Sequence, residues 1–561
     1  MKFPQMPYTR PEFEAVNSKF TTILESLKTA KTADDAFAAY KEYDDYSAYI
    51  MSMFAIARIR NTLDTTNPEY DAEKTYMDEV LPKLQALLQS FTEVLLASPF
   101  RKEMEAAWGN LMFKNAEISL KTFKPELVES MQEENRLRSE YVKLIASAQI
   151  QFDGKTLTLA QMTPYFQDPD RNVRKNAARA YGEWFMERSN KWDTIFDDLT
   201  KLRHQMSQAL GHKNFVETGY YRMQRNCYDA EMVGKFREGV KKYIVPLAAR
   251  LKAAQKDRIG VDALKMYDDQ FEYPEGNAKP FGTPDEIFAH GKKMYHELSD
   301  ETAEFIDFML ENELFDVLTR PGKAAGGYCA TIPIYKAPFI FANFNGTAGD
   351  IDVLTHEAGH AYASYKAREI YPSALRRYSN ETAEVHSMAM EFFTWPWMEG
   401  FFGKETDKYY YSHLASALIF IPYGTMVDEF QHHIYEKPDM TPAQRNALWL
   451  KLEGEYRPWL DLTETPFYEE GRRWQAQTHI YGTPFYYIDY CLAQSMSLSL
   501  WAESQEDFKA AWDKYVRFTG FAGTKTFVEL IADAGLPTPF VPENLKTIAD
   551  AAAKWLDAKE S

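Results

Sequence analysis

Two histidines and a glutamate near the middle of this 561-residue chain have the spacing of a metal site with a general base. The five residues HEAGH, here called the pentad, run from His356 to His360. Histidines four residues apart on an α-helix project from one face, about one turn apart, and can bind one metal ion. Glu357, next to the first histidine, is placed to take a proton from water at that metal. The alternative is a helix on which the two histidines only cap or pack.

A third metal ligand is expected downstream, because a catalytic zinc usually takes three protein ligands and leaves one position open. After a break at 368–380, the helical run ETAEVHSMAMEFFTWPW offers four candidates, namely Glu381, Glu384, His386 and Glu391. A helix–loop–helix hairpin would return Glu384 to the pentad. Glu384 and Glu391 are two turns apart on one face, so one could bind the metal while the other orients a histidine. Acids on a solvated face are the alternative, but the residues between them are too apolar for a freely exposed helix.

A cluster of tyrosines with one histidine lies near the C-terminus, in the segment THIYGTPFYYIDYCLAQ at 478–494. Its aromatic polar residues are His479, Tyr481, Tyr486, Tyr487 and Tyr490. Tyr487 and Tyr490 would share a face of a helix. A phenol stays protonated at pH 7, so it can donate a hydrogen bond to an oxyanion. Without further context, an aromatic stripe in the core explains the same pattern.

An extended segment precedes the pentad, and it is broken by glycine and proline between β-prone residues. Residues 338–344 are expected to form a strand, followed by a turn at Asn345-Gly346 and a helix capped by Asp350 or Asp352. The stretch KAPFIFANFNG at 336–346 fits an edge strand that binds an extended peptide through its backbone. Gly326 and Gly327 would let the peptide approach closely. A buried strand or an irregular connector is the alternative.

The rest of the chain predicts a mainly α-helical protein with this small β element beside the metal-binding helix. Apolar residues recur at helical spacing through most of the first 200 residues, and the chain is mostly helical again after the pentad. Asp153-Gly154 between β-prone residues predicts a hairpin at 150–159. The long stretches expected to be helical before the pentad are 33–61, 70–98, 125–149 and 168–208.

Composition excludes several classes of protein. Hydrophobic residues make up 45% of the chain, which argues for a folded core. The formal net charge of −18 argues against a nucleic-acid partner, whose phosphates would be repelled. Three scattered cysteines do not form a disulfide framework, and no secretory signal or membrane-spanning run is visible. We therefore expect a soluble protein of the cytoplasm without a membrane partner. The sequence carries no sign of a particular oligomeric state.

Three motifs together resemble oligoendopeptidase F and its thimet-oligopeptidase relatives. They are HEAGHA from His356, the glutamate of AEVHSMAMEFF, and the upstream GGYC. The resemblance is strong over 320–399, recurs over 409–490, and is only architectural before residue 200. It implies a mostly helical fold of two lobes with a central substrate channel. Residues 1–200, including the hairpin, would form an N-terminal helical lobe and residues 201–561 the catalytic lobe.

The resemblance also assigns roles to residues. It implies one Zn²⁺ per chain, held by His356, His360 and Glu384, with Glu357 as the general base. His479 and a tyrosine would stabilise the oxyanion, with Tyr490 as first choice and Tyr487 as second. The identity of this donor is open because the chain reads Gly482-Thr483-Pro484 where the thimet branch has a further Gly-Tyr pair. The residues expected to contact the substrate are Gly326, Gly327, Tyr328, Phe341, Ala342 and Tyr486.

The implied activity is zinc-dependent hydrolysis of internal bonds in short, unfolded peptides. Two alternatives remain at this point. The first is a zinc carboxypeptidase built on a similar helical fold. The second is a non-catalytic helical scaffold in which zinc is structural or absent, although structural zinc sites usually have four protein ligands that are commonly cysteines.

Overall fold

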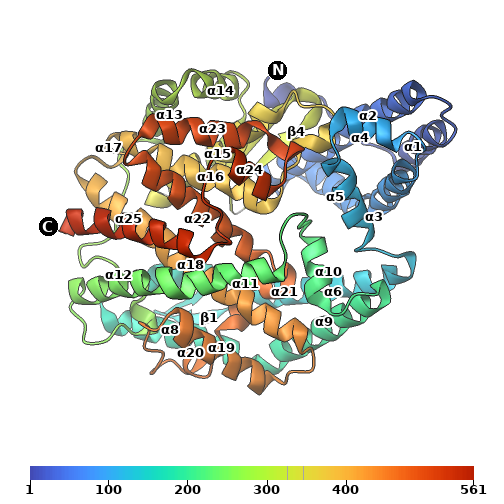
Figure 1. The fold of residues 1–561 in the computed structure, drawn as a ribbon. Coiled ribbons are helices and arrows are strands. Elements are labelled where there is room, and N and C mark those ends of the chain that lie inside the picture. Colours follow the sequence, from blue (N-terminus) through green and yellow to red (C-terminus); the bar gives the residue numbers. More distant parts are fainter. Residues whose placement is uncertain (325, 345, 561) are drawn as a thin grey trace. The chain divides into compact units, whose positions relative to one another are not determined.

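The computed structural model describes residues 1–324, 326–344 and 346–560, and the chain is mainly α-helical (Figure 1). Contacts divide it into two compact units. The first unit consists of residues 1–120, 278–407 and 503–536, and the second of residues 121–277, 408–502 and 537–561. The expected lobe boundary after residue 200 falls inside the helix Ser189–Leu210. The division by contacts therefore differs from the predicted one, because segments distant in sequence pack together in each unit.

The first unit contains five N-terminal helices, a three-stranded sheet and the helices around the pentad. Its elements are α1 (Phe13–Lys28), α2 (Ala33–Leu63), α3 (Pro68–Leu96), α4 (Arg101–Trp108), α5 (Leu111–Leu120), α13 (Pro284–Leu298), α14 (Asp300–Glu311), β3 (Phe315–Leu318), β4 (Tyr328–Ile332), β5 (Ala337–Phe344), α15 (Ala348–Ala367), α16 (Asn380–Phe393), α17 (Glu399–Phe402), α23 (Phe508–Gly520) and α24 (Phe527–Asp533).

The second unit contains the hairpin and the helices that carry the tyrosine-rich segment. Its elements are α6 (Val128–Ala146), β1 (Ile150–Phe152), β2 (Lys155–Leu157), α7 (Leu159–Met162), α8 (Arg171–Met186), α9 (Ser189–Leu210), α10 (Phe215–Arg222), α11 (Ala230–Gly239), α12 (Val245–Arg258), most of α18 (Thr406–Glu436), α19 (Pro442–Tyr456), α20 (Pro466–Glu469), α21 (Thr478–Gly482), most of α22 (Tyr487–Ser504) and α25 (Pro542–Glu560).

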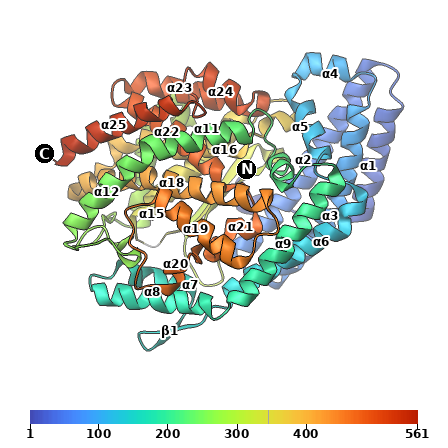
Figure 2. The ribbon, with the colours of Figure 1, turned by 60° about the horizontal axis from the view of Figure 1, so that its bottom comes forward.

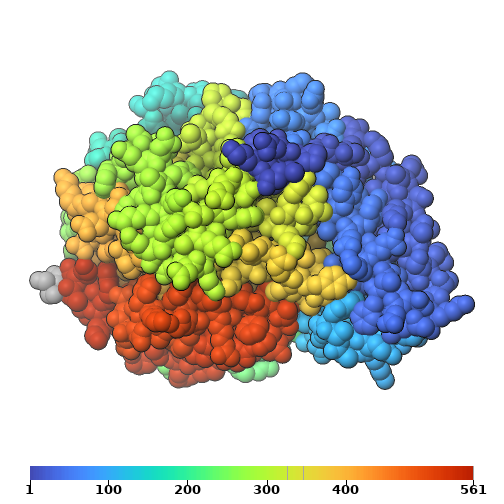
Figure 3. All heavy atoms as spheres, turned by 90° about the horizontal axis from the view of Figure 1, so that it is seen from above, coloured from blue at the N-terminus to red at the C-terminus, as the bar shows by residue number. Residues whose placement is uncertain are grey.

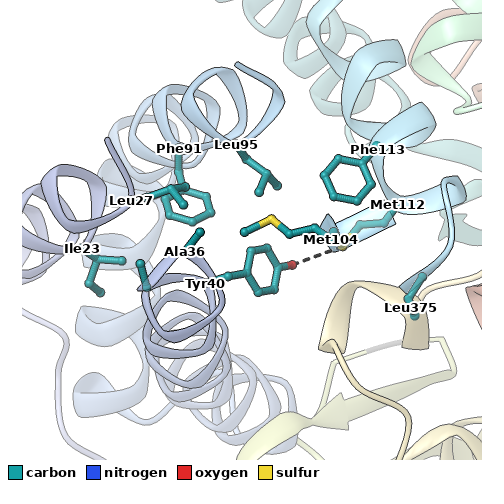
Figure 4. Packing of buried hydrophobic residues seen from close by; sticks show 11 residues of the cluster. Ile23, Leu27, Ala36, Tyr40, Phe91, Leu95, Met104, Met112, Phe113 and Leu375 are labelled. Carbon is teal, nitrogen blue, oxygen red and sulfur yellow. Dashed lines mark hydrogen bonds between the residues drawn. The ribbon is translucent and has the colours of Figure 1, made fainter. Parts of the chain in front are cut away.

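The N-terminal helices α1, α2 and α3 lie side by side (Figure 2). Threonine and asparagine start two of them, because Thr32 forms a capping box at α2 and Asn67 accepts backbone hydrogen bonds at α3. Their shared core includes Tyr40, whose hydroxyl lies 3.3 Å from the sulfur of Met112 (Figure 4). Leu375, from the segment between α15 and α16, packs into the same core. These helices therefore support the connection between the two helices that carry the pentad and Glu384.

The three-stranded sheet has the order β3-β5-β4, with β5 parallel to β3 and antiparallel to β4. β5 is thus the central strand, and the prediction of an open edge at 336–346 is wrong. The cause is visible in the side chains, since all residues of β5 except Asn343 are buried, as in a strand covered on both faces. Phe341 of this strand is paired with both neighbouring strands, and the carbonyl of Ala342 accepts a hydrogen bond from Nζ of Lys323 at 2.5 Å.

The N-terminus packs on this part of the first unit. The backbone N–H of Phe3 donates to the carbonyl of Asn312 at 2.9 Å, and its ring lies 4.5 Å from that of Phe339. Figure 3 shows these first residues, in dark blue, on the surface beside the yellow-green segment that contains the sheet. The start of the chain therefore packs against the sheet that lies next to the pentad helix.

Most predicted elements are present with small changes at their ends. The strand at 338–344 and the hairpin at 150–159 are confirmed, and Asp153 and Gly154 at its turn both have positive φ, at 52° and 69°. The helix with the pentad begins at Ala348. Asp350 lies in its first turn and accepts a hydrogen bond from the Gly346 N–H at 2.7 Å, while Asn345 lies outside the described residues. Across the described ranges, none of the helices is both long and apolar enough to span a membrane.

Candidate metal centre and catalytic residues

Two histidines of α15 and one glutamate of α16 meet in the first unit. One nitrogen each from His356 and His360 and one carboxylate oxygen of Glu384 all lie within 4.8 Å of one another. The Nε2 atoms of the two histidines are 3.5 and 3.7 Å from Oε2 of Glu384. The structure therefore brings together the three residues predicted as metal ligands, two of them from the pentad and one from the second helix of the hairpin.

A glycine allows the two helices to approach closely enough for this. A Cβ on Gly359, the fourth residue of the pentad, would lie 2.4 Å from the carbonyl oxygen of His386 and 2.6 Å from Cα of Ser387. No larger side chain fits at that crossing. Ser387 also donates a hydrogen bond to Oε2 of Glu384 at 3.1 Å, which orients that carboxylate. His386 itself is not among the grouped ligand atoms and packs on the rings of Tyr378 and Phe518.

Glu391, one of the four candidates for the third metal ligand, lies next to Nδ1 of His356. Its Oε1 is 2.6 Å from Nδ1 of His356. A proton on Nδ1 shared with this carboxylate leaves the lone pair of Nε2 free, on the side of Glu384. Of the two acids that share this face of α16, Glu384 thus lies with the ligand atoms and Glu391 orients a histidine.

The charges around the two histidines favour a bound cation. Burial opposes a charge on His356, but the carboxylates of Glu384 and Glu391 raise its pKa well above the usual value. Burial and the neighbouring His356 lower the pKa of His360 to about 4. Two carboxylates beside two imidazoles therefore attract one positive charge, which either a proton or a metal ion supplies.

Replacing Glu391 is expected to weaken metal binding without removing a ligand. The Glu391→Ala variant should bind zinc on the order of 10- to 100-fold more weakly, because His356 loses the partner that orients it. Glu391→Gln keeps an acceptor for the Nδ1 proton and should lose less. A competition titration with a chromophoric chelator measures both affinities. An unchanged affinity of Glu391→Ala would contradict the orienting role.

Glu357 faces the sheet side of α15 and is largely enclosed. Its side chain is buried, and no described residue donates a hydrogen bond to its Oε2. A Cβ on Gly327 would lie 3.7 Å from its Oε1, in ordinary van der Waals contact, so the chain at Gly327 runs directly beside this carboxylate. Burial and the charge of Glu384 raise the pKa of Glu357 to about 7, against the effect of His356, and a metal ion nearby would favour its ionised form. A carboxylate in this setting can accept a proton and return it.

The edge strand beside Glu357 is β4, which has β5 on one side only among the described residues. Gly326 precedes it with φ of 93°, a conformation that favours glycine. Tyr328 starts the strand, stacks on Phe341 and shares a hydrogen bond with Thr62 of α2 at 2.6 Å. Of the predicted substrate residues in the first unit, Gly326, Gly327 and Tyr328 therefore lie at or just before the edge strand, and Phe341 and Ala342 lie in the central strand β5.

The histidine and tyrosines predicted near the C-terminus form a cluster in the second unit. The ring of His479 on α21 lies 4.9 Å from that of Tyr487 and 6.4 Å from that of Tyr490 on α22. The ring of Tyr486 is 5.9 Å from His479. These four side chains are half-buried, whereas Tyr481 is fully buried and stacks on Tyr141. The structure thus groups His479 with both candidate tyrosines and assigns Tyr481 to the core.

Buried arginines hold this cluster in place. Arg225 pairs with Asp489 of α22 at 2.8 Å and donates to the carbonyl oxygen of Phe485. Arg203 donates to the carbonyl oxygen of Tyr481 at 2.5 Å. The sequence does not identify these arginines, because each lies more than 200 residues from its contact in this segment and no local spacing connects them.

The family of the chain follows from its comparison with known proteins. The sequence model of the peptidase M3 N-terminal domain matches residues 3–123, and that of peptidase family M3 matches residues 165–541. The chain belongs to peptidase family M3. It is therefore a metallopeptidase, and the metal implied by the family fits the His-His-Glu group described above.

Relatives of this M3 chain cover most of its length. Oligopeptidase PepF of Bacillus subtilis is 23% identical over 412 residues, which are 72% of this chain and 60% of that protein. An oligoendopeptidase F homolog of Borreliella burgdorferi is 22% identical over 85% of this chain and 82% of its own length. The solved structure of PZ peptidase A with an inhibitor is 46% identical, with a TM-score of 0.92 and 100% of both chains covered. The mainly α-helical fold expected from the sequence is confirmed.

Proposed function

We propose that this M3 peptidase is a zinc-dependent oligoendopeptidase that hydrolyses internal bonds of short, unfolded peptides. The observation that carries the proposal is the grouping of His356, His360 and Glu384 beside a buried carboxylate, Glu357, and an open strand edge. The relatives named as oligopeptidases and oligoendopeptidases support the substrate class.

The donor set suits zinc. Two imidazole nitrogens and one carboxylate oxygen form a common set of three ligands at catalytic zinc sites, which leaves a position open for water or substrate. When bound, zinc would lower the pKa of water and polarise the carbonyl of the peptide. The absence of cysteine from this set argues against a purely structural zinc, the form that a non-catalytic scaffold would need.

Glu357 performs the proton transfers. Its Oε2 is buried and has no hydrogen-bond donor among the described residues, so it is free to accept a proton from the attacking water. The same carboxyl then gives this proton to the nitrogen of the leaving amine as the C–N bond breaks. A group with a pKa not far from neutral performs both steps at physiological pH.

The edge of β4 is the proposed site for the peptide backbone. An extended peptide added along 328–332 would pair its N–H and C=O groups with the strand, so it would be recognised by its backbone more than by its side chains. Gly327 lies beside Glu357, and the space around Gly326 is open, so a peptide could approach the backbone there. Tyr328 and Tyr486 remain proposed contacts for substrate side chains.

His479 and Tyr490 are the proposed hydrogen-bond donors to the oxyanion, with Tyr487 as the second choice. The Tyr490→Phe variant is expected to lose on the order of 100- to 1,000-fold in kcat, because it removes one donor and keeps the ring. Tyr487→Phe is the matched control and should lose much less. Steady-state kinetics on one fluorogenic peptide compares the two. The reverse order of effects would transfer the role to Tyr487.

Cleavage of a peptide blocked at both termini tests the function directly. An endopeptidase cuts such a peptide, whereas a carboxypeptidase needs a free C-terminus. We expect cleavage at an internal bond, loss of cleavage after treatment with a chelator, and recovery when zinc is added back. Failure to cut the blocked peptide while cutting a free one would support the carboxypeptidase. Full activity in chelator would contradict the role of the metal.

We expect the protein to act in the cytoplasm without a nucleic-acid partner. A net charge of −18 supports the absence of a nucleic-acid partner, and three cysteines outside disulfides are consistent with the cytoplasm. The two lobes and substrate channel implied by the resemblance predict that folded proteins are excluded. Rapid cleavage of a native globular protein would contradict that exclusion.

A further inference from the structure

In the second unit, hydrogen bonds connect the side chains of Tyr423, Gln477 and His479, in that order. The hydroxyl of Tyr423, on α18, donates to Oε1 of Gln477 at 2.6 Å. Nε2 of the same amide lies 3.1 Å from Nδ1 of His479. Nε2 of His479 makes no hydrogen bond within the described part of the chain, so one nitrogen of this ring is held and the other is available.

The orientation of the Gln477 amide follows from its contact with the hydroxyl of Tyr423. The guanidinium groups of Arg457 and Arg473 lie 5.0 and 4.3 Å from the centre of the Tyr423 ring. Cations beside a phenol draw electron density from its oxygen, so that oxygen is a weak acceptor and its O–H a strong donor. Tyr423 therefore faces the amide oxygen, and the amide N–H₂ group of Gln477 is turned toward His479.

An amide nitrogen donates but does not accept, and this determines which nitrogen of the imidazole carries the proton. Nδ1 of His479 must accept from Gln477, so a neutral ring has its proton on Nε2. Burial lowers the pKa of His479, which keeps the ring neutral near pH 7. The free side of the ring is then a hydrogen-bond donor, as an oxyanion requires.

We propose that Gln477 is a positioning residue that fixes His479 in the tautomer protonated at Nε2, so that His479 donates a hydrogen bond to the carbonyl oxygen of the bound peptide. This role rests on the proposed function, because it assumes that His479 contacts the reacting group. Tyr423 acts one step further away, by holding the amide of Gln477 in its orientation.

The tautomer is measured on the zinc-loaded protein by nitrogen NMR of ¹⁵N-labelled histidine side chains, with the His479 signals identified by their loss in His479→Gln. The parent is expected to show a protonated Nε2 and an unprotonated Nδ1. In Gln477→Glu the carboxylate can only accept, so the proton is expected to move to Nδ1. Spectra at pH 8.5 keep a histidine beside one carboxylate neutral. Thr478→Glu is the matched control, since it adds the same charge at an exposed neighbouring position and should leave the tautomer unchanged.

Kinetics then test whether the tautomer matters. Gln477→Glu should lose on the order of 100-fold in kcat with little change in KM, whereas Thr478→Glu should stay near the parent. In the His479→Gln background, Gln477→Glu should cause no further loss, because its effect passes through the imidazole. An additive loss in that background would indicate a general structural defect and overturn the proposal.

Two other results would also overturn it. A proton that stays on Nε2 in Gln477→Glu would show that Gln477 does not set the tautomer. A proton that moves to Nδ1 without loss of kcat would show that His479 donates nothing to the reacting group. A parent protein unable to cut the blocked peptide would instead contradict the proposed function, and the NMR result is independent of that activity.

Discussion

The Glu357→Gln variant is expected to keep its zinc and to lose on the order of 100- to 10,000-fold in kcat. Glutamine has the same size and fits the same buried space, but its amide cannot accept a proton from water. The metal should stay, because the grouped ligand atoms come from His356, His360 and Glu384 and not from Glu357. Metal analysis of the dialysed protein and turnover of the blocked peptide give the two readouts.

A matched control for this variant exists on the neighbouring helix. Glu381 is also buried, at 2% exposure, and accepts a hydrogen bond from Ser379 at 2.5 Å, but it is not among the grouped ligand atoms. Glu381→Gln should therefore keep both zinc and most of its activity. Full activity of Glu357→Gln would exclude it as the general base. Loss of zinc from Glu357→Gln would indicate that this carboxylate binds the metal itself.

The grouping of the metal-ligand candidates was predictable because helix geometry makes it local. Four residues along one helix place His356 and His360 on one face, and the next helix in the sequence, α16, packs against it. Helix spacing alone left four candidates for the third ligand and the family resemblance favoured Glu384, whereas the close contact at Gly359 that brings its helix beside the histidines is visible only in three dimensions. The sequence shows a glycine at position 359 but not why a glycine is needed there, because the atoms that a side chain would meet belong to α16.

The strand before the pentad shows where pattern reasoning fails. The run of apolar residues at 337–344 correctly indicated a strand, but a run without polar alternation is typical of one covered on both faces. The position within the sheet depends on β3 and β4, which come from separate segments. The edge expected at Phe341 and Ala342 is therefore found at β4, which begins with Tyr328, another predicted substrate contact.

The supports of the tyrosine cluster could not be predicted from the sequence. His479 and the tyrosines stood out by type and spacing, but Arg225 contacts the carbonyl of Phe485 across 260 residues of chain. Gln477 lies only two residues from His479, yet spacing does not show which of its atoms face the ring. Long-range contacts and side-chain orientation, more than residue type, decide how this site is held.

Replacing the third ligand is expected to have the other large effect. Glu384→Ala should retain much less than one zinc per chain after dialysis and should have no measurable turnover, because two imidazoles alone hold the metal weakly and the site loses the one carboxylate that is grouped with them. The comparison with Glu391→Ala decides between the two acids on this face of α16. The Glu391→Ala variant should lose only about 10- to 100-fold in zinc affinity, and added zinc should restore its turnover.

The order of these two losses tests the geometry, since both carboxylates contact His356 at its two different nitrogens. The carboxylate near Nε2 is placed to bind the metal itself, whereas the carboxylate at Nδ1 acts through the ring. If Glu391→Ala lost its zinc more completely than Glu384→Ala, the assignment of ligand and orienting residue would be reversed. If excess zinc restored Glu384→Ala to full turnover, the carboxylate of Glu384 would not be required at the metal, and the third ligand would have to come from another residue.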